Sequence, residues 1–539
     1  MLYYEVFAKS LVDAGVTTMF GQMGDANLYM VDNYVHGQGG RYVAAANEFG
    51  AMLMAIGYAH RTGKVGVVTI THGPALTNLL TPLVEGVRDR VPVVLLAGDT
   101  SLSVRNHPQD IAQQAVIATS GAGFEHSGSP KTIQRDLAIA LRRAAVERRP
   151  IALNLPTEYT WQDIEYHPMR MLPALAPSTR PDAHALDAAL GVLASARRPL
   201  VLLGHGIAAA DRSVVLRLAE RIGAPVATTL KGKGSVGNEP FALGVCGAFA
   251  SAYGNETILA ADCIVAFGAS LNRFTTAEGS LVKDTAVVHC DVDTTAIGLH
   301  MTPTVGVVGD AGATATAMLE LIEAAEIPPA EFRDAVVAQH EQHRDPFGGY
   351  QDCSTDRTVD VRTALRRINT AVPSRRTVVM DGGRNMGQPF KLVDAYDPAA
   401  WLYLLGFGSI GLGTGAAIGA AVGAPDEPTL LVTGDGGFMS GGLHEFHTAV
   451  RERLDLIAVI ANDGAYGAEH VHFRDHGMDP SLSTFDWPDF ASVAEALGAR
   501  GVTVRCLADL DIAARAIAER DRPLLIDLKL DPDAVPPLL

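Results

Sequence analysis

Two apolar runs near the C-terminus each end in residues that could bind a divalent cation. Asp435 follows the run 429–433, and Asn462 and Gly464 follow the run 456–460. A carboxylate, an amide oxygen and a loop carbonyl are the hard oxygen ligands that Mg²⁺ prefers, and they leave coordination positions for phosphate oxygens. We therefore predict a magnesium site formed by Asp435, Asn462 and the carbonyl of Gly464.

The same segments could also hold phosphate groups. Glycine lets an anion approach the backbone closely, and a helix that we expect to start near Gly442 would direct its positive dipole end at that anion. Open α/β sheets bind ligands at the carboxyl ends of their strands, which is where these loops are expected to lie. Beside the metal ligands, the residues predicted to bind a phosphorylated cofactor here are Gly434, Gly436, Gly437 and Tyr466.

Glu48 is a charged residue in small and apolar surroundings. It follows the sequence AAAN at 44–47, and a charge in such a stretch costs several kcal/mol unless it is paired or used. The alternative is an ordinary exposed glutamate at the start of a helix. We interpret Glu48 as a functional carboxylate.

Short β-branched runs recur along the chain, and a helical pattern follows each of them. Continuous apolar strands that alternate with helices imply parallel sheets covered on both faces, so we expect an α/β protein. The predicted strands cover residues 65–71, 92–97, 150–155, 200–203, 261–267, 286–292, 377–380, 429–433 and 456–460.

The length of 539 residues suggests about three domains, at the usual size of about 100–200 residues each. Two segments of unusual composition mark the boundaries: 168–181 is rich in proline, and 328–357 is first charged and then rich in small and polar residues. We therefore expect domains at 1–165, 183–325 and 356–539, each large enough to bury its own core.

The composition excludes several classes of function. The formal net charge is −17, and a chain this acidic is not expected to bind nucleic acid. The five cysteines show no CxxC spacing, so they predict neither a disulfide framework nor a zinc site. No run of about 18 apolar residues and no signal-peptide pattern occurs, so we expect a cytoplasmic protein without a membrane partner.

The spacing between GDG at 434–436 and Asn462 resembles the cofactor motif of thiamine diphosphate enzymes. The surroundings of Glu48 resemble those of the catalytic glutamate in the group of acetolactate synthase, pyruvate decarboxylase and benzoylformate decarboxylase. This resemblance implies that Glu48 bonds to the aminopyrimidine ring and promotes deprotonation of thiazolium C2. It also implies three doubly wound parallel-sheet domains, which are pyrimidine-binding, central and diphosphate-binding.

The same resemblance carries an expectation about assembly. In this group the cofactor lies between the first domain of one subunit and the third domain of another. We therefore expect a homodimer or homotetramer with active sites at the subunit interfaces.

Further residues match the group. Ile410, in GFGSIGLG at 406–413, stands where these enzymes have a bulky apolar residue that bends the cofactor. A glycine-rich helix that packs closely on a neighbour is the structural alternative, and both readings can hold together. Asp381 and Gly383 follow the predicted strand 377–380 and resemble the first loop on the diphosphate side. We expect these three residues to contact thiamine diphosphate.

Three titratable residues are candidates for proton transfer at the substrate end. Asp25 lies in GQMGDANL at 21–28, which resembles the GxPGDxNL loop of pyruvate and indolepyruvate decarboxylases, with Met23 in place of proline. His72 enters a loop similar to TSGPGATN of acetolactate synthases, at the place where benzoylformate decarboxylase has a histidine. Glu469 stands where pyruvate decarboxylases have a catalytic glutamate. The alternatives are a helix-capping turn residue, a core histidine and a solvated helix residue, respectively.

The sequence also departs from these families. NHPQD at 106–110 replaces the adjacent histidine pair of pyruvate decarboxylases, and the Phe-Gln-Glu signature of acetolactate synthases is absent, although Gln113 or Gln114 could serve as its glutamine. The central domain follows the layout of the acetolactate synthase flavin domain. Its segments GVCG at 244–247 and GASLNR at 268–273 have diverged, so FAD is an alternative that we do not favour.

Together these patterns predict a thiamine diphosphate- and Mg²⁺-dependent, non-oxidative decarboxylase of a small-molecule 2-oxo acid. The C2 carbanion would attack the substrate, CO₂ would leave, and Asp25, His72 or Glu469 would protonate the enamine. The alternatives are an acetolactate-synthase-like carboligase and a lyase or hydrolase that cleaves a C–C bond without CO₂. A catalytically silent cofactor-binding scaffold is a further alternative, and the intact Glu48 and GDG residues argue against it.

Overall fold

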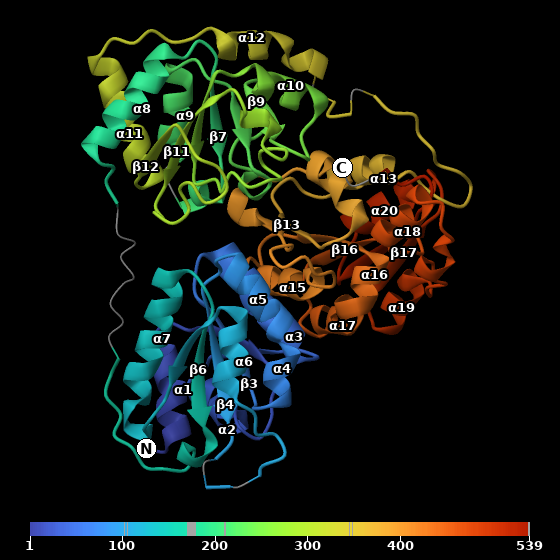
Figure 1. Cartoon of the computed structure of the whole chain (residues 1–539). Helices are drawn as coiled ribbons and strands as arrows, with labels where there is room; N and C mark the ends of the chain where they lie inside the picture. The colour runs from blue at the N-terminus through green and yellow to red at the C-terminus, as the bar shows by residue number, and fades with distance from the viewer. Residues whose placement is uncertain are drawn as a thin grey trace.

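The structure, a computed structural model, consists of three α/β units, each built on one six-stranded parallel sheet (Figure 1). It describes residues 1–536 except 102, 105, 170–178, 210–211, 344 and 348, so most of the proline-rich connector and the last three residues lie outside the described part. The α/β class and the three parallel-sheet units are confirmed. The domain boundaries proposed above stay predictions.

The N-terminal unit carries the first sheet, whose strand order is β2-β1-β3-β4-β6-β5. Its strands are β1 (Thr18–Gly21), β2 (Arg41–Ala44), β3 (Gly66–Ile70), β4 (Val93–Asp99), β5 (Gly123–His126) and β6 (Ile151–Pro156). Its helices are α1 (Tyr3–Asp13), α2 (Leu28–Asp32), α3 (Glu48–Thr62), α4 (Pro74–Asn78), α5 (Leu80–Arg88), α6 (Gln113–Ser120) and α7 (Ile133–Glu147).

The C-terminal unit repeats this strand order as β14-β13-β15-β16-β18-β17. Its strands are β13 (Thr377–Met380), β14 (Trp401–Tyr403), β15 (Thr429–Gly434), β16 (Leu456–Asn462), β17 (Arg500–Val504) and β18 (Leu524–Lys529). Its helices are α13 (Val361–Ala371), α14 (Gly387–Leu392), α15 (Gly413–Gly423), α16 (Asp435–Gly437), α17 (Leu443–Arg451), α18 (Gly467–Asp475), α19 (Phe490–Ala496) and α20 (Asp509–Ala518).

The central unit has a different order, β12-β11-β10-β7-β8-β9. Its strands are β7 (Pro199–Leu203), β8 (Val226–Thr228), β9 (Ala242–Val245), β10 (Cys263–Phe267), β11 (Ala286–Asp291) and β12 (Val305–Val308). Its helices are α8 (Ala183–Ser195), α9 (Arg212–Arg221), α10 (Ala252–Ala260), α11 (Ala311–Ala324) and α12 (Phe332–Gln339). Among the described residues, every helix is too short or too polar to cross a lipid bilayer.

Helices α3 and α15 pack the N-terminal unit on the C-terminal unit, and one hydrophobic core runs through both units (Figure 1). The contact is as close as backbones allow, since a Cβ at Gly57 would lie 2.0 Å from the Ala416 carbonyl oxygen and one at Gly419 would lie 1.9 Å from that of Met54. Any larger residue would push the helices apart. The two units that are expected to bind the cofactor are therefore held in a fixed relation within one chain.

One expectation about local structure is wrong. The helix after β15 begins at Asp435 as α16 and continues through a π-helical turn at Phe438–Gly442 into α17, rather than starting near Gly442. Glycine has a low helix propensity, so the sequence favoured a loop here, but tertiary packing overrides that preference. A Cβ at Gly441 would lie 2.4 Å from the Gly411 carbonyl oxygen, so only glycine lets this turn approach the neighbouring loop.

Candidate active site

The predicted metal ligands meet at the carboxyl edge of the C-terminal sheet. Strands β15 and β16 pair in parallel with Gly434 opposite Ala461, so the residues that follow them lie side by side. The backbone N–H of Gly464 donates to Asp435 Oδ2 at 2.8 Å and to Asn462 Oδ1 at 3.3 Å. Because both oxygen atoms contact one nitrogen, the carboxylate and the amide oxygen are close enough to share a cation.

A buried aspartate that the sequence analysis missed fixes the orientation of Asn462. The Nδ2 atom of Asn462 donates to Asp527 Oδ1 at 2.9 Å, which leaves the Asn462 amide oxygen for the metal side. The other Asp527 oxygen accepts from Phe490 N at 3.0 Å and pairs with Lys529 at 2.7 Å. Outer groups of this kind orient metal ligands. The available signal was an acidic residue inside the apolar strand 524–529.

The backbone around Asp435 fits a metal-bound diphosphate. Helix α16 starts at Asp435, so the positive end of its dipole lies at this edge. Gly464 has φ +66°, and its carbonyl accepts from Phe485 N at 2.7 Å with one lone pair left for a cation. The Tyr466 ring lies over the turn, because a Cβ at Gly436 would be 2.8 Å from it. Gly383 has φ +132°, a backbone conformation that glycine adopts most easily, and the space beside its Cα is open.

Asp381 joins three segments of this edge rather than pointing freely into it. Its buried carboxylate accepts from the N–H groups of Gly382, Gly411 and Leu412 and from Thr433 Oγ1, at 2.7–3.2 Å. Burial raises the pKa of Asp381, while hydrogen bonds from Gly382, Thr433, Gly413 and Leu412 lower it. The carboxylate thus holds the loop that contains Ile410, and any contact of Asp381 with the cofactor stays a prediction.

The protonation of Asp435 gives a testable pH dependence. Burial, and next the charge of Asp463, raise the pKa of Asp435 from 3.8 to about 7. Protons and Mg²⁺ compete for the same oxygen atoms. We expect Mg²⁺-dependent affinity for thiamine diphosphate to be full above about pH 7 and to fall by about tenfold per pH unit below it. Calorimetric titration of the apo protein from about pH 8 to about pH 5.5 measures this.

The contribution of Asp435 to the stability of the apo protein should respond in the opposite sense. The folded-state pKa lies above the ordinary value, so folded Asp435 binds more protons than unfolded Asp435 between about pH 4 and 7, and the contribution of this side chain to the free energy of unfolding falls as pH rises through that window. Asp463→Asn removes the second cause and should move the midpoint of metal-dependent binding to lower pH. An Mg²⁺-dependent affinity for thiamine diphosphate that does not change between about pH 8 and 6 would contradict the assignment of Asp435 as a metal ligand.

Glu48 begins helix α3 and is held by two side-chain amides of its own unit. Gln22, with its amide nitrogen facing the carboxylate, donates to both Glu48 oxygens at 2.9 and 3.0 Å, and Asn78 Nδ2 donates to Oε2 at 3.0 Å. Asn47 caps the helix by accepting from Gly50 N at 2.8 Å. Glu48 is therefore a buried, oriented carboxylate and not an exposed helix-start residue.

A second buried carboxylate, Glu445 on α17, reaches across from the C-terminal unit to the start of α3. Its Oε1 accepts from the N–H groups of Ala46 and Asn47 at 3.0 and 3.1 Å, and its Oε2 accepts from Thr448 at 3.0 Å. Glu445 was not among the predicted site residues. No sequence pattern marks it, because the backbone groups that it contacts lie some 400 positions away in the sequence.

Asp25 and His72 come together at the ends of β1 and β3. Thr71 Oγ1 donates to Asp25 Oδ1 at 2.8 Å, and the same oxygen lies 3.7 Å from His72 Nε2. The first residue before α2 is Asn27, so Asp25 does not cap that helix. His107 packs edge-on against the ring of His72 at 5.3 Å between centroids, and the sequence analysis did not include it. Both candidates lie near Glu48, since Gln22 belongs to the loop that contains Asp25 and Asn78 ends helix α4, which follows the His72 loop.

Gln113 keeps the His72 loop in place. Its Oε1 accepts from Gly73 N at 3.0 Å, while its Nε2 donates to Gly98 O and Asn154 Oδ1 at 2.8 and 2.7 Å. Gln114 is exposed. Of the two glutamines considered, Gln113 is thus the one inside the site, and its amide positions the loop.

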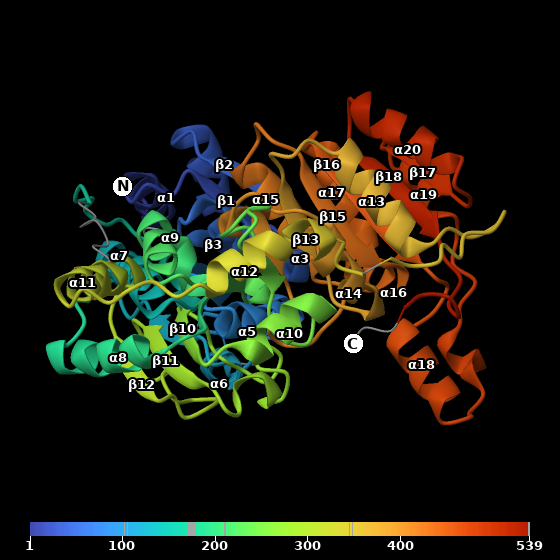
Figure 2. The same cartoon turned by 90° about the horizontal axis from the view of Figure 1, so that it is seen from above.

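The structure does not bring Glu469 to the other candidates. Helix α18 projects from the body of the molecule, and Glu469 is exposed on it (Figure 2). Its neighbour His470 is buried and pairs with Asp533 at 2.9 Å. The proton-donor role of Glu469 therefore stays a prediction.

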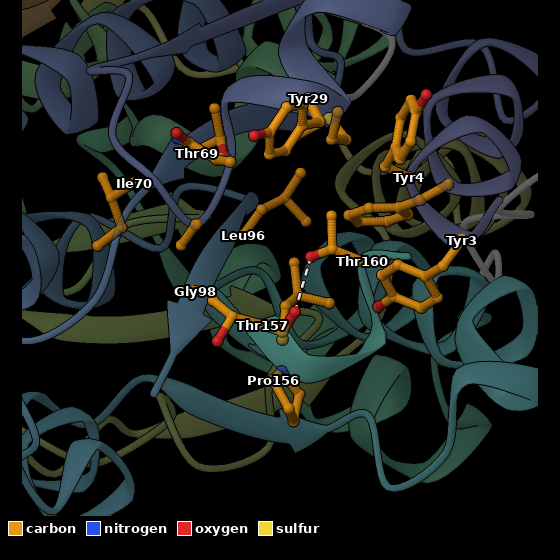
Figure 3. Close-up of a pocket in the computed structure, with 15 residues that line it drawn as sticks. Tyr3, Tyr4, Tyr29, Thr69, Ile70, Leu96, Gly98, Pro156, Thr157 and Thr160 are labelled. Carbon is orange, nitrogen blue, oxygen red and sulfur yellow. Dashed lines mark hydrogen bonds between the residues drawn. The ribbon is translucent and has the colours of Figure 1, made fainter. Parts of the chain in front are cut away.

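A small cavity lies beside the Asp25 loop (Figure 3). It is lined by Tyr3, Tyr29, Thr69 and Thr157 among others, and Thr160 donates to the Thr157 carbonyl at 2.8 Å. Its volume of about 30 Å³ has room for water but not for a substrate, and no predicted site residue lines it. We therefore expect the catalytic site at the strand ends described above and not in this cavity.

Comparison with known families covers most of the chain. Three domain families match: the thiamine pyrophosphate enzyme N-terminal TPP binding domain at 1–120, the central domain at 186–318 and the C-terminal TPP binding domain at 381–528. The chain is 28% identical to acetolactate synthase of Mycobacterium leprae, over 98% of this chain and 86% of that protein.

Other relatives show the same extent of similarity. The large subunit of acetolactate synthase isozyme 3 from Escherichia coli is 28% identical over 98% of this chain and 94% of its own. Sulfoacetaldehyde acetyltransferase of Castellaniella defragrans is 28% identical over 94% of this chain and 88% of that protein. The chain therefore belongs to the thiamine pyrophosphate enzymes and is a thiamine diphosphate-dependent enzyme of the acetolactate synthase group.

Proposed function

We propose that the protein decarboxylates a small 2-oxo acid with thiamine diphosphate and Mg²⁺ and releases the product as an aldehyde. The observation that carries this proposal is the pair of Asp25 and His72. His72 is buried, its Nδ1 has no partner among the described atoms, and its Nε2 lies 3.7 Å from the Asp25 carboxylate. An imidazole with a free buried nitrogen beside a carboxylate suits proton transfer to a bound substrate.

The other residues bind and orient. Asp435, Asn462 and the Gly464 carbonyl would hold Mg²⁺, while the N-terminus of α16 and the glycines at 434, 436 and 437 would bind the diphosphate. When bound, thiamine diphosphate supplies the nucleophilic carbon and the electron sink for decarboxylation. Glu48, kept in place by Gln22 and Asn78, would hold a proton at the aminopyrimidine ring.

We also propose that two copies of the chain complete each site, in a homodimer or homotetramer. Within one chain, the partners of the Glu48 carboxylate are Gln22 and Asn78 of the N-terminal unit, while the metal ligands cluster on the C-terminal sheet. Light scattering on the purified protein tests this, and an active monomer would overturn it.

FAD stays outside the proposal. At the point of the central sheet where the strand order reverses, Gly206 N donates to Gly268 O at 3.1 Å, so the loops after β7 and β10 contact each other. Ligands of open α/β sheets bind between such loops, so this contact lies at the place where a ligand of the central sheet would enter.

A carboligase is the second candidate, and the relatives favour it. Two of the proteins described above are acetolactate synthases, and Glu469, one of the residues predicted to protonate the enamine, is exposed. The discriminating experiment is CO₂ release with product identification across aliphatic and aromatic 2-oxo acids. Aldehyde supports the decarboxylase and acyloin the carboligase, whereas CO₂ from no substrate would overturn both.

His72 provides the sharper test of the proton-transfer proposal. We expect His72→Gln to lower the rate of aldehyde formation by about a hundredfold, because it removes the group that moves the proton. CO₂ release in the presence of an acceptor aldehyde should fall less, since that route does not need the same proton. Glu469→Leu, measured in parallel, shifts products toward acyloin only if Glu469 also donates. An aldehyde rate unchanged by His72→Gln would sink the proposed role.

A further inference from the structure

A buried glutamate of the N-terminal unit holds the loop of the C-terminal unit that contains Ile410. Glu85 lies on α5, and its side chain is 0% exposed. Its Oε1 accepts from the N–H of Gly406 at 2.8 Å, and its Oε2 accepts from the N–H of Phe407 at 2.6 Å. Both donors belong to the segment 404–412, which connects β14 with α15.

Ile410 thus stands between two carboxylate anchors. On its C-terminal side, Asp381 accepts from the N–H groups of Gly411 and Leu412 at 3.1 and 3.2 Å. On its N-terminal side, Glu85 fixes the two residues that precede Gly408. Asp381 belongs to the same unit as the loop, whereas Glu85 comes from the N-terminal unit, some 320 positions earlier. The position of Ile410 therefore depends on both units.

The groups around Glu85 make this contact specific. Asp89, which follows the last residue of α5, pairs with Lys231 of the central unit, and a Cβ at Gly406 would lie 2.4 Å from Asp89 Oδ1. Arg88 donates to the Gly406 carbonyl at 3.3 Å and lies 4.8 Å from the centre of the Phe407 ring. Burial, and next the charge of Asp89, raise the pKa of Glu85, while the two N–H donors and Lys231 lower it. All three units meet at this point.

We infer that Glu85 is a positioning residue, which fixes residues 406 and 407 so that Ile410 stands correctly against bound thiamine diphosphate. The inference rests on the proposed role of Ile410 in the cofactor site. It gives each N-terminal unit two tasks in a dimer with shared sites. Through Glu48 the unit serves the site that it shares with the partner chain, and through Glu85 it sets the cofactor loop of its own chain.

The test replaces Glu85 by glutamine and compares it with a matched control. The amide of Glu85→Gln accepts at one position only, so one of the two backbone N–H groups loses its partner. We expect affinity of the apo protein for thiamine diphosphate with Mg²⁺ to fall by about tenfold, and the near-ultraviolet circular dichroism of the bound cofactor to change. Calorimetric titration and dichroism measure both without reference to turnover.

Glu427→Gln is the control, because Glu427 is also a buried glutamate that joins the same two units. It accepts from Arg61 of α3 at 2.6 Å and from Thr377 at 2.9 Å, and it does not contact the segment 404–412. We expect Glu427→Gln to lower the thermal midpoint and to leave cofactor affinity and dichroism as in the parent. An equal loss of affinity in both variants would assign the effect to general loosening of the units and overturn the inference.

A second variant keeps the test decisive if Glu85→Gln fails to fold. Arg88 is exposed, so Arg88→Met should fold, and the loss of its contact with the loop should weaken cofactor binding in the same direction by about threefold. Parent-like affinity and dichroism in a folded Glu85→Gln protein, or in Arg88→Met if only that variant folds, overturn the inference alone. Failure of the parent itself to bind thiamine diphosphate would instead overturn the proposed cofactor site and the inference with it.

Discussion

Glu48→Gln is expected to lower turnover by about a thousandfold while thiamine diphosphate stays bound, which is the range over which a positioned acid–base group acts. The reason lies in the burial and the hydrogen bonds of the Glu48 side chain. Glu48 is buried at the first turn of α3 and accepts hydrogen bonds from Gln22 and Asn78. The amide is nearly isosteric, so it preserves the packing of α3 on α15, but it cannot take up and return a proton.

The measurement is steady-state turnover of the identified 2-oxo acid, together with calorimetric affinity for the cofactor. Glu5→Gln is a matched control, because Glu5 also lies in the first turn of a helix, where it accepts from Leu2 N at 2.9 Å. The control should retain parent turnover. Turnover of Glu48→Gln within about tenfold of the parent would show that the carboxylate is not the activating group.

Most of the fold could be predicted from the sequence because its central strands are continuously apolar. All nine predicted runs correspond to strands, among them β3, β15 and β16, whose residues are buried except for the partly buried Gly434. The strands that were missed are mainly short or lie at sheet edges. In β2, at 41–44, exposed and partly exposed residues alternate with a buried valine, and so short a segment gives no reliable periodicity.

The candidate site divides in the same physical way. Residues that end a strand, such as Asp435 and Asn462, could be found because strand ends and their chemistry are both readable along the chain. Asp527, Glu445 and Glu85 could not be found, because each acts through contacts with residues far away in sequence. A buried carboxylate that accepts hydrogen bonds from distant groups leaves no local pattern beyond one acidic residue among apolar ones.

Asp435→Ala should abolish Mg²⁺-dependent retention of thiamine diphosphate. Asp435 is the one carboxylate among the three predicted ligands, so its loss removes the only formal negative charge that they offer to the cation. Replacing groups that merely orient a metal ligand typically costs about 10–100-fold in affinity, and loss of the ligand itself should exceed that. We expect Asp435→Ala to weaken binding by more than about a hundredfold and Asp527→Asn to fall within the lower range.

Calorimetric titration of each apo variant with thiamine diphosphate, with and without Mg²⁺, makes the comparison. Asp310→Asn serves as the matched control, because Asp310 also accepts two backbone N–H groups at a helix start, at 3.0 and 3.3 Å, but lies in the central unit. It should bind the cofactor as the parent does. We expect cofactor affinity to decrease in the order parent, Asp527→Asn, Asp435→Ala. Asp527 acts on the metal site through the amide nitrogen of Asn462, whereas Asp435 offers its own oxygen. Retention by Asp435→Ala equal to that of the control would place the metal elsewhere and remove the assignment.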